Sequence, residues 1–512
     1  MTKTDPTAWS LSRRSAVAAM GAALLLPLAA CAGSPGAGSR TTTPSPSAPD
    51  PGAGAVNPLG SLTGTPSLSA EQYETMVEGI ANWVTRAWPL MGPVWPGVDY
   101  TRHRIVALQV DEQFKATRAW VISTAGHREL KAAEFADIEP PSSYGKVEFE
   151  GQPSITLNLG QAAAASNGPG HGEETTASGN ATPSITATGS SAPTADLTDP
   201  ATFAFALMTH ELVHFYYQGE INVSASSSRD TPYPYQARPR TLRRMLLDRL
   251  RLAATDPGKR AEHLGHARHW LDTWKSEFAQ EAQDIHHYDI AEGVARYVEY
   301  MALSIQADQS AEQLQARQAP LLQEESLDVS VDVESYAFGF VTGVLLDATR
   351  PGWKSGFYAG GKTLTELLLE EVSPVPEDID PAVSGKVDEL IKESEEYTGP
   401  DIRKIDAAEA DTSVAYLRVH EYGEIGYGGS FAYKDKVVLT TTILVLDGEG
   451  HNLQVLGVPS FTGPDREVLT IPLVGAPHSY ANGVLMVDGE EITGTIKAEK
   501  AIESGREVFI AK

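Results

Sequence analysis

Two histidines and a glutamate lie inside an apolar segment, and this combination constrains the fold more than any other feature of the sequence. The segment Thr202–Gln218 reads as a buried helix and contains His210-Glu211-Leu212-Val213-His214, with apolar residues on both sides. Residues 210 and 214 are about one helical turn apart, so both imidazoles are expected to point the same way. Burying them beside a carboxylate costs free energy unless something compensates the polar groups, and a bound metal ion does so.

The spacing of the motif is suggestive but does not decide the matter alone. With 13 His and 67 Asp plus Glu in 512 residues, a sequence of the form His-[Asp/Glu]-x-x-His is expected by chance about 0.04 times. The alternative is a helix with two incidental histidines. If a metal is bound, His210 and His214 supply two nitrogen ligands, Glu211 is placed to accept a proton from water, and a third ligand must come from another segment.

A second motif suggests that third ligand. The chain reads Asp289-Ile290-Ala291-Glu292-Gly293-Val294-Ala295-Arg296-Tyr297, and Glu292 follows His214 by 78 residues (292 − 214). His-Glu-x-x-His followed by a helix with Glu-Gly-x-Ala-x-Tyr resembles the gluzincins, the thermolysin- and aminopeptidase-like zinc metallopeptidases. The resemblance covers residues 200–350 best. It implies that His210, His214 and Glu292 bind Zn²⁺ and that Glu211 is the general base.

The resemblance also predicts supporting residues. Related enzymes place an aspartate four residues after the ligand glutamate to orient a histidine; this chain has Arg296 there, so Glu299 is the candidate for that role. Tyr336 is the candidate donor to the oxyanion, because related enzymes use a Tyr or His from a later helix; the alternative is a tyrosine that only packs at a helix start. The segment 336–343 is rich in small residues and is expected to pack behind the site.

The first thirty-one residues have the pattern of an export signal rather than a folded segment. Ser12-Arg13-Arg14 precedes an apolar run, Ala16–Ala30, that is too short to span a bilayer as a stable helix. The run ends in Leu28-Ala29-Ala30-Cys31, which resembles a bacterial lipobox, and Cys31 is the only cysteine of the chain. The resemblance implies lipidation at Cys31 and an extracytoplasmic, membrane-anchored protein; an incidental cysteine in a plain secretion signal is the alternative, and both twin-arginine and Sec export stay open.

The net charge and several weaker motifs indicate which classes of partner the protein can bind. The formal net charge of −27 argues against binding a nucleic-acid backbone. We expect a peptide or protein substrate, and the predicted strand Ser154–Leu159 is a candidate for pairing with an extended substrate at a sheet edge. One of His286 and His287 is an alternative metal ligand or substrate contact. Oligomeric state has no signal in the sequence.

Composition shifts divide the chain into segments. Strands are predicted at Arg104–Val110, Ala119–Ser123 and Ser154–Leu159, between a Ser/Pro/Gly-rich stretch and a low-complexity stretch. Near the C-terminus, short alternating β-branched runs replace the helical patterns. A helix is expected to begin near Ala70 with Ser69 as its N-cap. Further helices are expected at 261–282 and 290–305, among others, and Gly399-Pro400 is expected to mark a boundary. The predicted organisation is a signal peptide at 1–31, a tether at 32–66, a metallopeptidase domain at 67–400 with a surface insertion at 160–199, and a small antiparallel β-domain at 410–512.

These expectations combine into one hypothesis. The fold class is α+β: a mostly helical gluzincin-like catalytic domain with a small upstream β-sheet, followed by a C-terminal all-β domain. The predicted function is that of a lipid-anchored zinc metallopeptidase that hydrolyses peptide bonds through water activated by Glu211. The rival is a catalytically inactive surface-binding lipoprotein that kept the fold, and a third possibility is a purely structural zinc site.

Overall fold

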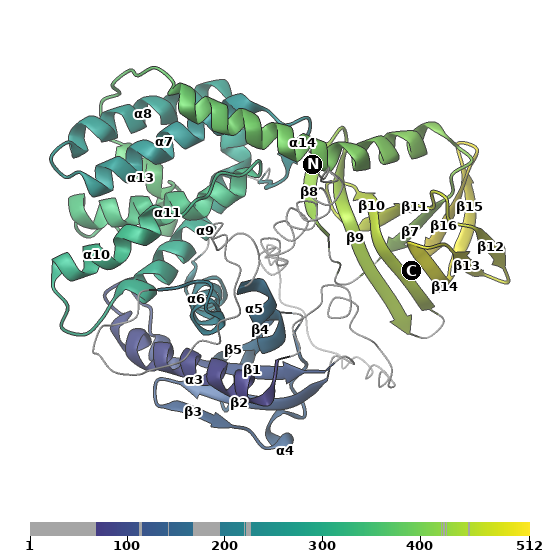
Figure 1. Cartoon of the computed structure of the whole chain (residues 1–512), viewed down its shortest axis with the longest axis horizontal. Helices are drawn as coiled ribbons and strands as arrows, with labels where there is room; N and C mark the ends of the chain where they lie inside the picture. The colour runs from purple at the N-terminus through teal and green to yellow at the C-terminus, as the bar shows by residue number, and fades with distance from the viewer. Residues whose placement is uncertain are drawn as a thin grey trace, which may run out of the picture.

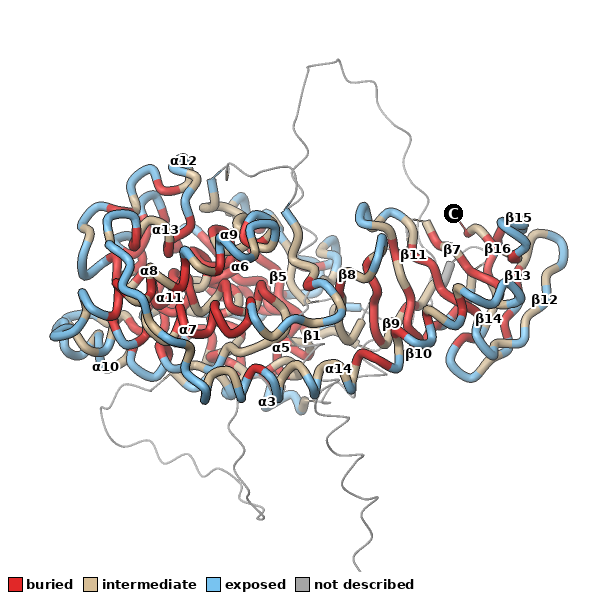
Figure 2. Tube along the Cα trace, turned by 90° about the horizontal axis from the view of Figure 1, so that it is seen from above, coloured by how far each residue is buried: buried red, intermediate tan, exposed pale blue. Residues whose placement is uncertain are grey.

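The computed structural model describes residues 68–511 apart from 112–114, 142, 167–194, 220, 222–226, 421, 423–424, 426 and 449–450. An N-terminal sheet, a helical region and a C-terminal β-rich region follow one another along the chain (Figure 1). The mixed α and β architecture is therefore confirmed. One large core joins the sheet to the helices and another fills the C-terminal region, as the burial in Figure 2 indicates. The predicted signal peptide with Cys31 and the tether lie outside the described residues.

Helix α3 (Ala70–Ala87) begins where the sequence predicts. The Ser69 hydroxyl accepts a hydrogen bond from the Gln72 amide at 3.2 Å, and the Gln72 side chain accepts one from the Ser69 amide at 2.7 Å. This reciprocal capping satisfies two amides that the helix start leaves unpaired. Buried Met76 and Ile80 belong to the apolar face with which α3 packs on the first sheet and on the helix of the metal motif.

The first sheet has five strands in the order β3-β2-β1-β5-β4. Strands β1 and β5 pair in parallel and the other neighbours pair antiparallel. Three of these strands, β1, β2 and β5, match predicted ones. The bounds, with a short intervening helix, are β1 (Arg104–Val110), β2 (Ala116–Ser123), β3 (Gly126–Glu129), α4 (Ala132–Phe135), β4 (Tyr144–Phe149) and β5 (Gln152–Asn158).

The predicted open edge at Ser154–Leu159 is wrong, because β5 lies between β1 and β4. The reason is a tight hairpin. Glu150 and Gly151 both have positive φ, at 50° and 71°, as the two central residues of a type I′ turn do. The turn folds β4 back onto β5, and among the described strands β4 has β5 as its one partner, so β4 forms the edge.

The helical region packs around α9 (Ala279–Ser304) and α11 (Val331–Thr349), the helix pair in most extensive contact (Figure 1). No helix in the described ranges has both the length and the apolar character needed to cross a membrane. The other helices and helical turns are Trp88–Leu90, Tyr100–Arg102, α5 (Leu159–Ser166), α6 (Pro200–Leu212), the π-helical turn η4 (Val213–Tyr217), α7 (Ala237–Thr255), α8 (Arg260–Glu277), α10 (Ala311–Leu322), α12 (Phe357–Gly360), α13 (Leu364–Leu369) and α14 (Pro381–Ala410).

Two predicted helix limits are wrong. The predicted helix 261–282 is divided, because Phe278 has φ −128° and ψ 51° and separates α8 from α9. The boundary at Gly399-Pro400 is absent: α14 continues through Pro400 to Ala410. Proline removes one backbone hydrogen bond from a helix, but α14 packs on α7, β9 and β10, and Gly399 and Ile402 on either side of the proline are buried. This packing outweighs the local cost.

The predicted surface insertion 160–199 starts too early. Residues 159–166 form α5, in which Ala162 and Ala163 are buried, and α5 packs on β1 and α6. The run of alanines in this segment looks like low complexity, but alanine is the best helix former and its small side chain allows close packing, which explains the error. Residues 167–194 lie outside the described residues, and Asp199 caps the start of α6 by accepting from the Thr202 amide at 2.9 Å.

The C-terminal β-rich region is confirmed, but it is not wholly antiparallel. Its last strand, β16, pairs in parallel with β7, because it enters the sheet on the side of β7 opposite β11. Strand β6 comes from the helical region and pairs in parallel with β8. The strands of this sheet are β6 (Thr231–Pro232), β7 (Tyr416–His420), β8 (Gly429–Tyr433), β9 (Lys436–Gly448), β10 (His451–Thr462), β11 (Val468–Pro472), β12 (His478–Ala481), β13 (Val484–Asp488), β14 (Ile492–Lys497), β15 (Glu499–Glu503) and β16 (Arg506–Ala511).

Candidate metal centre

Helix α6 is fixed in the core on the side that faces the sheet and α3. The indole of Trp88 donates to the Thr209 hydroxyl at 3.0 Å, and the Tyr100 hydroxyl donates to the Thr209 carbonyl at 2.8 Å. Thr209 directly precedes His210, so these bonds hold the backbone at the start of the motif. The opposite side of α6 faces α9, where Glu292 lies.

The second histidine lies in a π-helical turn rather than in regular α-helix. The Gln218 amide donates to the Val213 carbonyl at 2.7 Å, which closes a wider turn around His214. Such turns are rare in proteins as a whole, and those that occur are often found at functional sites. The Gln218 side chain uses both ends: its oxygen lies 3.0 Å from His214 Nδ1, and its amide donates to the Ala291 carbonyl at 3.1 Å. This glutamine therefore ties His214 to the helix that carries Glu292.

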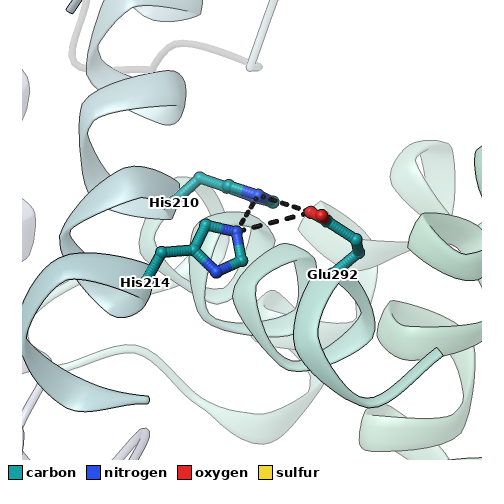
Figure 3. Close-up of side chains that lie close together, drawn as sticks. All are labelled: His210, His214 and Glu292. Atoms are coloured by element: carbon teal, nitrogen blue, oxygen red, sulfur yellow. Dashed lines mark hydrogen bonds and ion pairs between the residues drawn. The ribbon is translucent and has the colours of Figure 1, made fainter. Parts of the chain in front are cut away.

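His210, His214 and Glu292 converge on one point, as predicted (Figure 3). The two Nε2 atoms are 3.0 Å apart, and Oε2 of Glu292 lies 3.3 Å from that of His210 and 3.4 Å from that of His214. All three side chains are buried. They form the one group of this kind found in the described residues, and a geometry of two imidazole nitrogens and one carboxylate oxygen suits a divalent metal ion.

The electrostatics of the group also suit a cation. Burial alone would lower the pKa of His210, but Glu292 and Glu299 raise it to about 10. Burial would raise the pKa of Glu292, yet His214 and His210 hold it well below its usual range. A raised imidazole pKa in a buried place means that the surrounding carboxylates create a negative electrostatic potential there. The same potential favours the binding of a metal cation.

Three further contacts to carboxylates surround the ligands. The Glu299 carboxylate lies 2.9 Å from His210 Nδ1, so the predicted contact between these two residues is present. Arg296, which occupies the expected aspartate position, pairs with the other oxygen of Glu299 at 3.2 Å. On the far side of Glu292, Nη2 of Arg229 lies 3.9 Å from Oε1. Outer contacts of this kind fix the tautomer and orientation of ligands.

Glu211 lies beside the ligands and is buried, and burial raises its pKa. The nearby hydroxyl of Tyr144, the first residue of β4, partly offsets this rise in the pKa of Glu211. Tyr144 could not be predicted from the sequence, because Val147 and Phe149 are too few apolar residues to mark its strand and no local pattern links residue 144 to residue 211.

Tyr336 lies in the site, where the sequence placed a candidate donor. Its ring stacks on that of His210 with centroids 5.8 Å apart, and the Arg296 guanidinium lies 5.0 Å from its centroid. Burial and then Glu292 raise the pKa of its phenol well above its ordinary value, so it stays protonated and able to donate. His286, in contrast, bonds Glu366 at 3.2 Å, and neither it nor His287 belongs to the metal-binding group.

Close backbone packing sets the distance between α9 and α11. A Cβ added to Gly339 would lie 2.1 Å from the Cα of Gly293, so neither helix could approach as closely with a larger residue there. One turn further, Gly343 leaves room for the ring of Tyr297. The small residues predicted to pack behind the site therefore do so, and they bring Tyr336 of α11 next to the Glu292 side of the centre.

Comparisons of the chain with protein-family models, with curated proteins and with solved structures found no match.

Proposed function

We propose that the chain is a zinc metallopeptidase of the gluzincin type. The observation that carries the proposal is the convergence of His210, His214 and Glu292 on one buried point, with the carboxyl of Glu211 beside it. Two histidines and one glutamate leave a fourth coordination position free, which distinguishes catalytic zinc sites from closed structural ones. A zinc ion held there would lower the pKa of a water molecule towards neutrality and polarise a substrate carbonyl.

The remaining chemistry is assigned to side chains. Glu211 accepts the proton of the attacking water and delivers it to the leaving amine, and its raised pKa suits both steps. The Tyr144 hydroxyl, which lies near Glu211, orients the carboxylate by donating to it. Tyr336 donates to the oxyanion that develops on the substrate, because its phenol is protonated and lies beside His210.

An extended peptide is the proposed substrate, paired with β4. That strand is one edge of the first sheet, and its first residue, Tyr144, lies near Glu211. Main-chain pairing along β4 would therefore lead the peptide to the catalytic carboxylate. We further propose that the protein is exported and anchored to the cell membrane through a lipid on Cys31, facing the extracytoplasmic side.

The experiment separates the three hypotheses of a peptidase, an inactive binding protein and a structural zinc site. Zinc content and cleavage of a peptide library are measured for the wild type, Glu211→Gln and Glu292→Ala, with Glu78→Gln on the exposed face of α3 as control. A peptidase requires that Glu211→Gln keep zinc and lose cleavage, that Glu292→Ala lose both, and that the control match the wild type. Zinc without any cleavage by the wild type would favour a binding protein or a structural site, and stoichiometric zinc in Glu292→Ala would rule out the ligand set.

A further inference from the structure

Residues 228–233 form a segment that contacts the metal centre on one side and the C-terminal β-rich region on the other. Its backbone is held at both ends. The Ser228 amide donates to the Asp284 carbonyl of α9 at 3.1 Å, and the Tyr233 amide donates to the Ala432 carbonyl of β8 at 2.8 Å. Between these ends, β6 pairs in parallel with β8, so the C-terminal sheet extends into the helical region.

Arg229 faces the metal centre. Its Nε and Nη2 atoms bind Asp332 of α11 at 2.7 and 2.6 Å, and its guanidinium lies over the ring of Tyr288 at 4.8 Å. Nη2 is also 3.9 Å from Oε1 of Glu292. The two oxygens of Glu292 are thereby divided: Oε1 faces Arg229, and Oε2 faces the two imidazoles.

The next residue, Asp230, faces the opposite way. Its Oδ1 atom accepts from Arg466 at 2.5 Å and from the Ser430 hydroxyl at 3.1 Å, and both partners belong to the C-terminal region. The partners of these two neighbouring residues lie on opposite sides of the segment, so anchoring Asp230 on one side holds Arg229 on the other. The Thr231 hydroxyl then accepts from the Val331 amide at 3.2 Å, which links the same segment to the start of α11.

From these contacts we infer that the C-terminal β-rich region is a positioning element of the metal centre. The region holds Asp230 through Arg466 and Ser430 and thereby fixes the position of Arg229. The Arg229 guanidinium then faces Oε1 of Glu292, and Oε2 is left to bind the metal. The inference rests on the proposed metal site and assigns the C-terminal region a role in it. Arg229 is a positioning residue, since it acts on the site through Glu292.

The test measures zinc affinity of the full-length protein by competition with a chelator. The variants are Arg229→Met, Arg466→Met, Ser430→Ala and the double change of Arg229 and Arg466. Arg418→Met is the matched control, because Arg418 lies in the same region, is 33% exposed against 36% for Arg466, and pairs with Glu503 at 2.9 Å away from the segment. Circular dichroism and thermal melting establish that each variant is folded, and Arg466→Lys is the variant expected to restore binding.

We expect Arg229→Met to weaken zinc binding about 10-fold or more, as loss of an outer contact to a ligand does. Arg466→Met and Ser430→Ala should weaken it about 3- to 10-fold, Arg418→Met should not change it, and the double variant should be no weaker than Arg229→Met alone, because both changes remove the same contact. Zinc affinity in Arg466→Met equal to that of the control, or losses that multiply in the double variant, would overturn the inference and leave the proposed peptidase intact. Failure of the wild type to bind zinc would overturn both.

Discussion

Glu292 and Glu299 lie seven residues apart on α9, and both reach His210. Seven residues make almost two turns of an α-helix, so the two side chains share one face. Oε2 of Glu292 lies 3.3 Å from Nε2 of His210, and Oε2 of Glu299 lies 2.9 Å from its Nδ1. A single helix therefore supplies one proposed ligand and the group that orients another, and a shift of α9 would disturb both together.

Replacing Glu299 tests that orienting role. Glu299→Gln keeps the size of the side chain but removes the charge that fixes the imidazole of His210, so zinc affinity is expected to fall about 10- to 100-fold. The measurement is a zinc titration in a metal buffer, with Glu78→Gln as a surface control. Unchanged zinc affinity in Glu299→Gln would show that the contact with Nδ1 does not support the metal.

Replacing Tyr336 tests the proposed oxyanion donor. Tyr336→Phe keeps the ring that stacks on His210 and removes the hydroxyl, so kcat is expected to fall about 10²- to 10³-fold while KM and zinc affinity stay close to wild type. Steady-state kinetics on a cleaved peptide measure this. Tyr235→Phe is the control, because the hydroxyl of Tyr235 bonds Thr398 on α14 instead. A wild-type kcat in Tyr336→Phe would leave the tyrosine only a packing role.

The parts of the site that could be predicted from the sequence are those with regular spacing along one helix. His210 and His214 are separated by one turn, and Glu299 lies on the face of Glu292, so helical periodicity alone brings each pair together. The strand 104–110 was predictable for a similar reason, since its buried run has the length and composition of a strand.

The parts that could not be predicted depend on contacts between distant segments. Tyr144 reaches Glu211 across 67 positions (211 − 144), and Arg229 reaches Glu292 from a loop whose local sequence has no helical or strand period. The helix end predicted at Pro400 was wrong because proline is a strong local signal for a helix end. The packing of α14 on two parts of the molecule overrides this signal. Local signals cannot report long-range packing.

The contact between Gly293 and Gly339 is expected to be intolerant of even a methyl group. Gly339→Ala would place its Cβ 2.1 Å from the Cα and carbonyl oxygen of Gly293, so α11 must move away from α9, at a cost of about 1–3 kcal/mol or more. Because Tyr336 belongs to α11 and Glu292 to α9, the peptidase activity should fall as well. Thermal melting and peptide cleavage measure the two effects.

The same substitution elsewhere provides the control for that experiment. Gly385 is exposed in α14, and a Cβ there would meet nothing within 4 Å. Gly385→Ala is therefore expected to raise stability by up to about 1 kcal/mol, because alanine favours the helix. Equal melting temperatures for the Gly339 and Gly385 variants would contradict the close packing of α9 on α11.

Glu366 is expected to stabilise the protein in a defined pH window. Burial alone would raise its pKa, but His286, Lys275 and the Thr363 amide lower it to about 2, and Glu366 in turn raises the pKa of His286 above 6.5. The contribution of the Glu366 carboxylate to stability is present above about pH 4.5 and is lost as pH falls towards 2. The contribution of protonated His286 is present below about pH 6.5 and is lost as pH rises through its raised pKa.

Glu366→Gln should therefore lower the melting temperature most between about pH 4.5 and 6.5, by about 3–6 °C, with smaller differences at pH 3 and pH 9. Glu370→Gln is the control: it breaks only surface pairs with Lys362 and Arg350 and should change the melting temperature by about 1 °C or less at every pH. An effect of Glu366→Gln that is equal at pH 3 and pH 5.5 would show that the paired charges contribute nothing to stability.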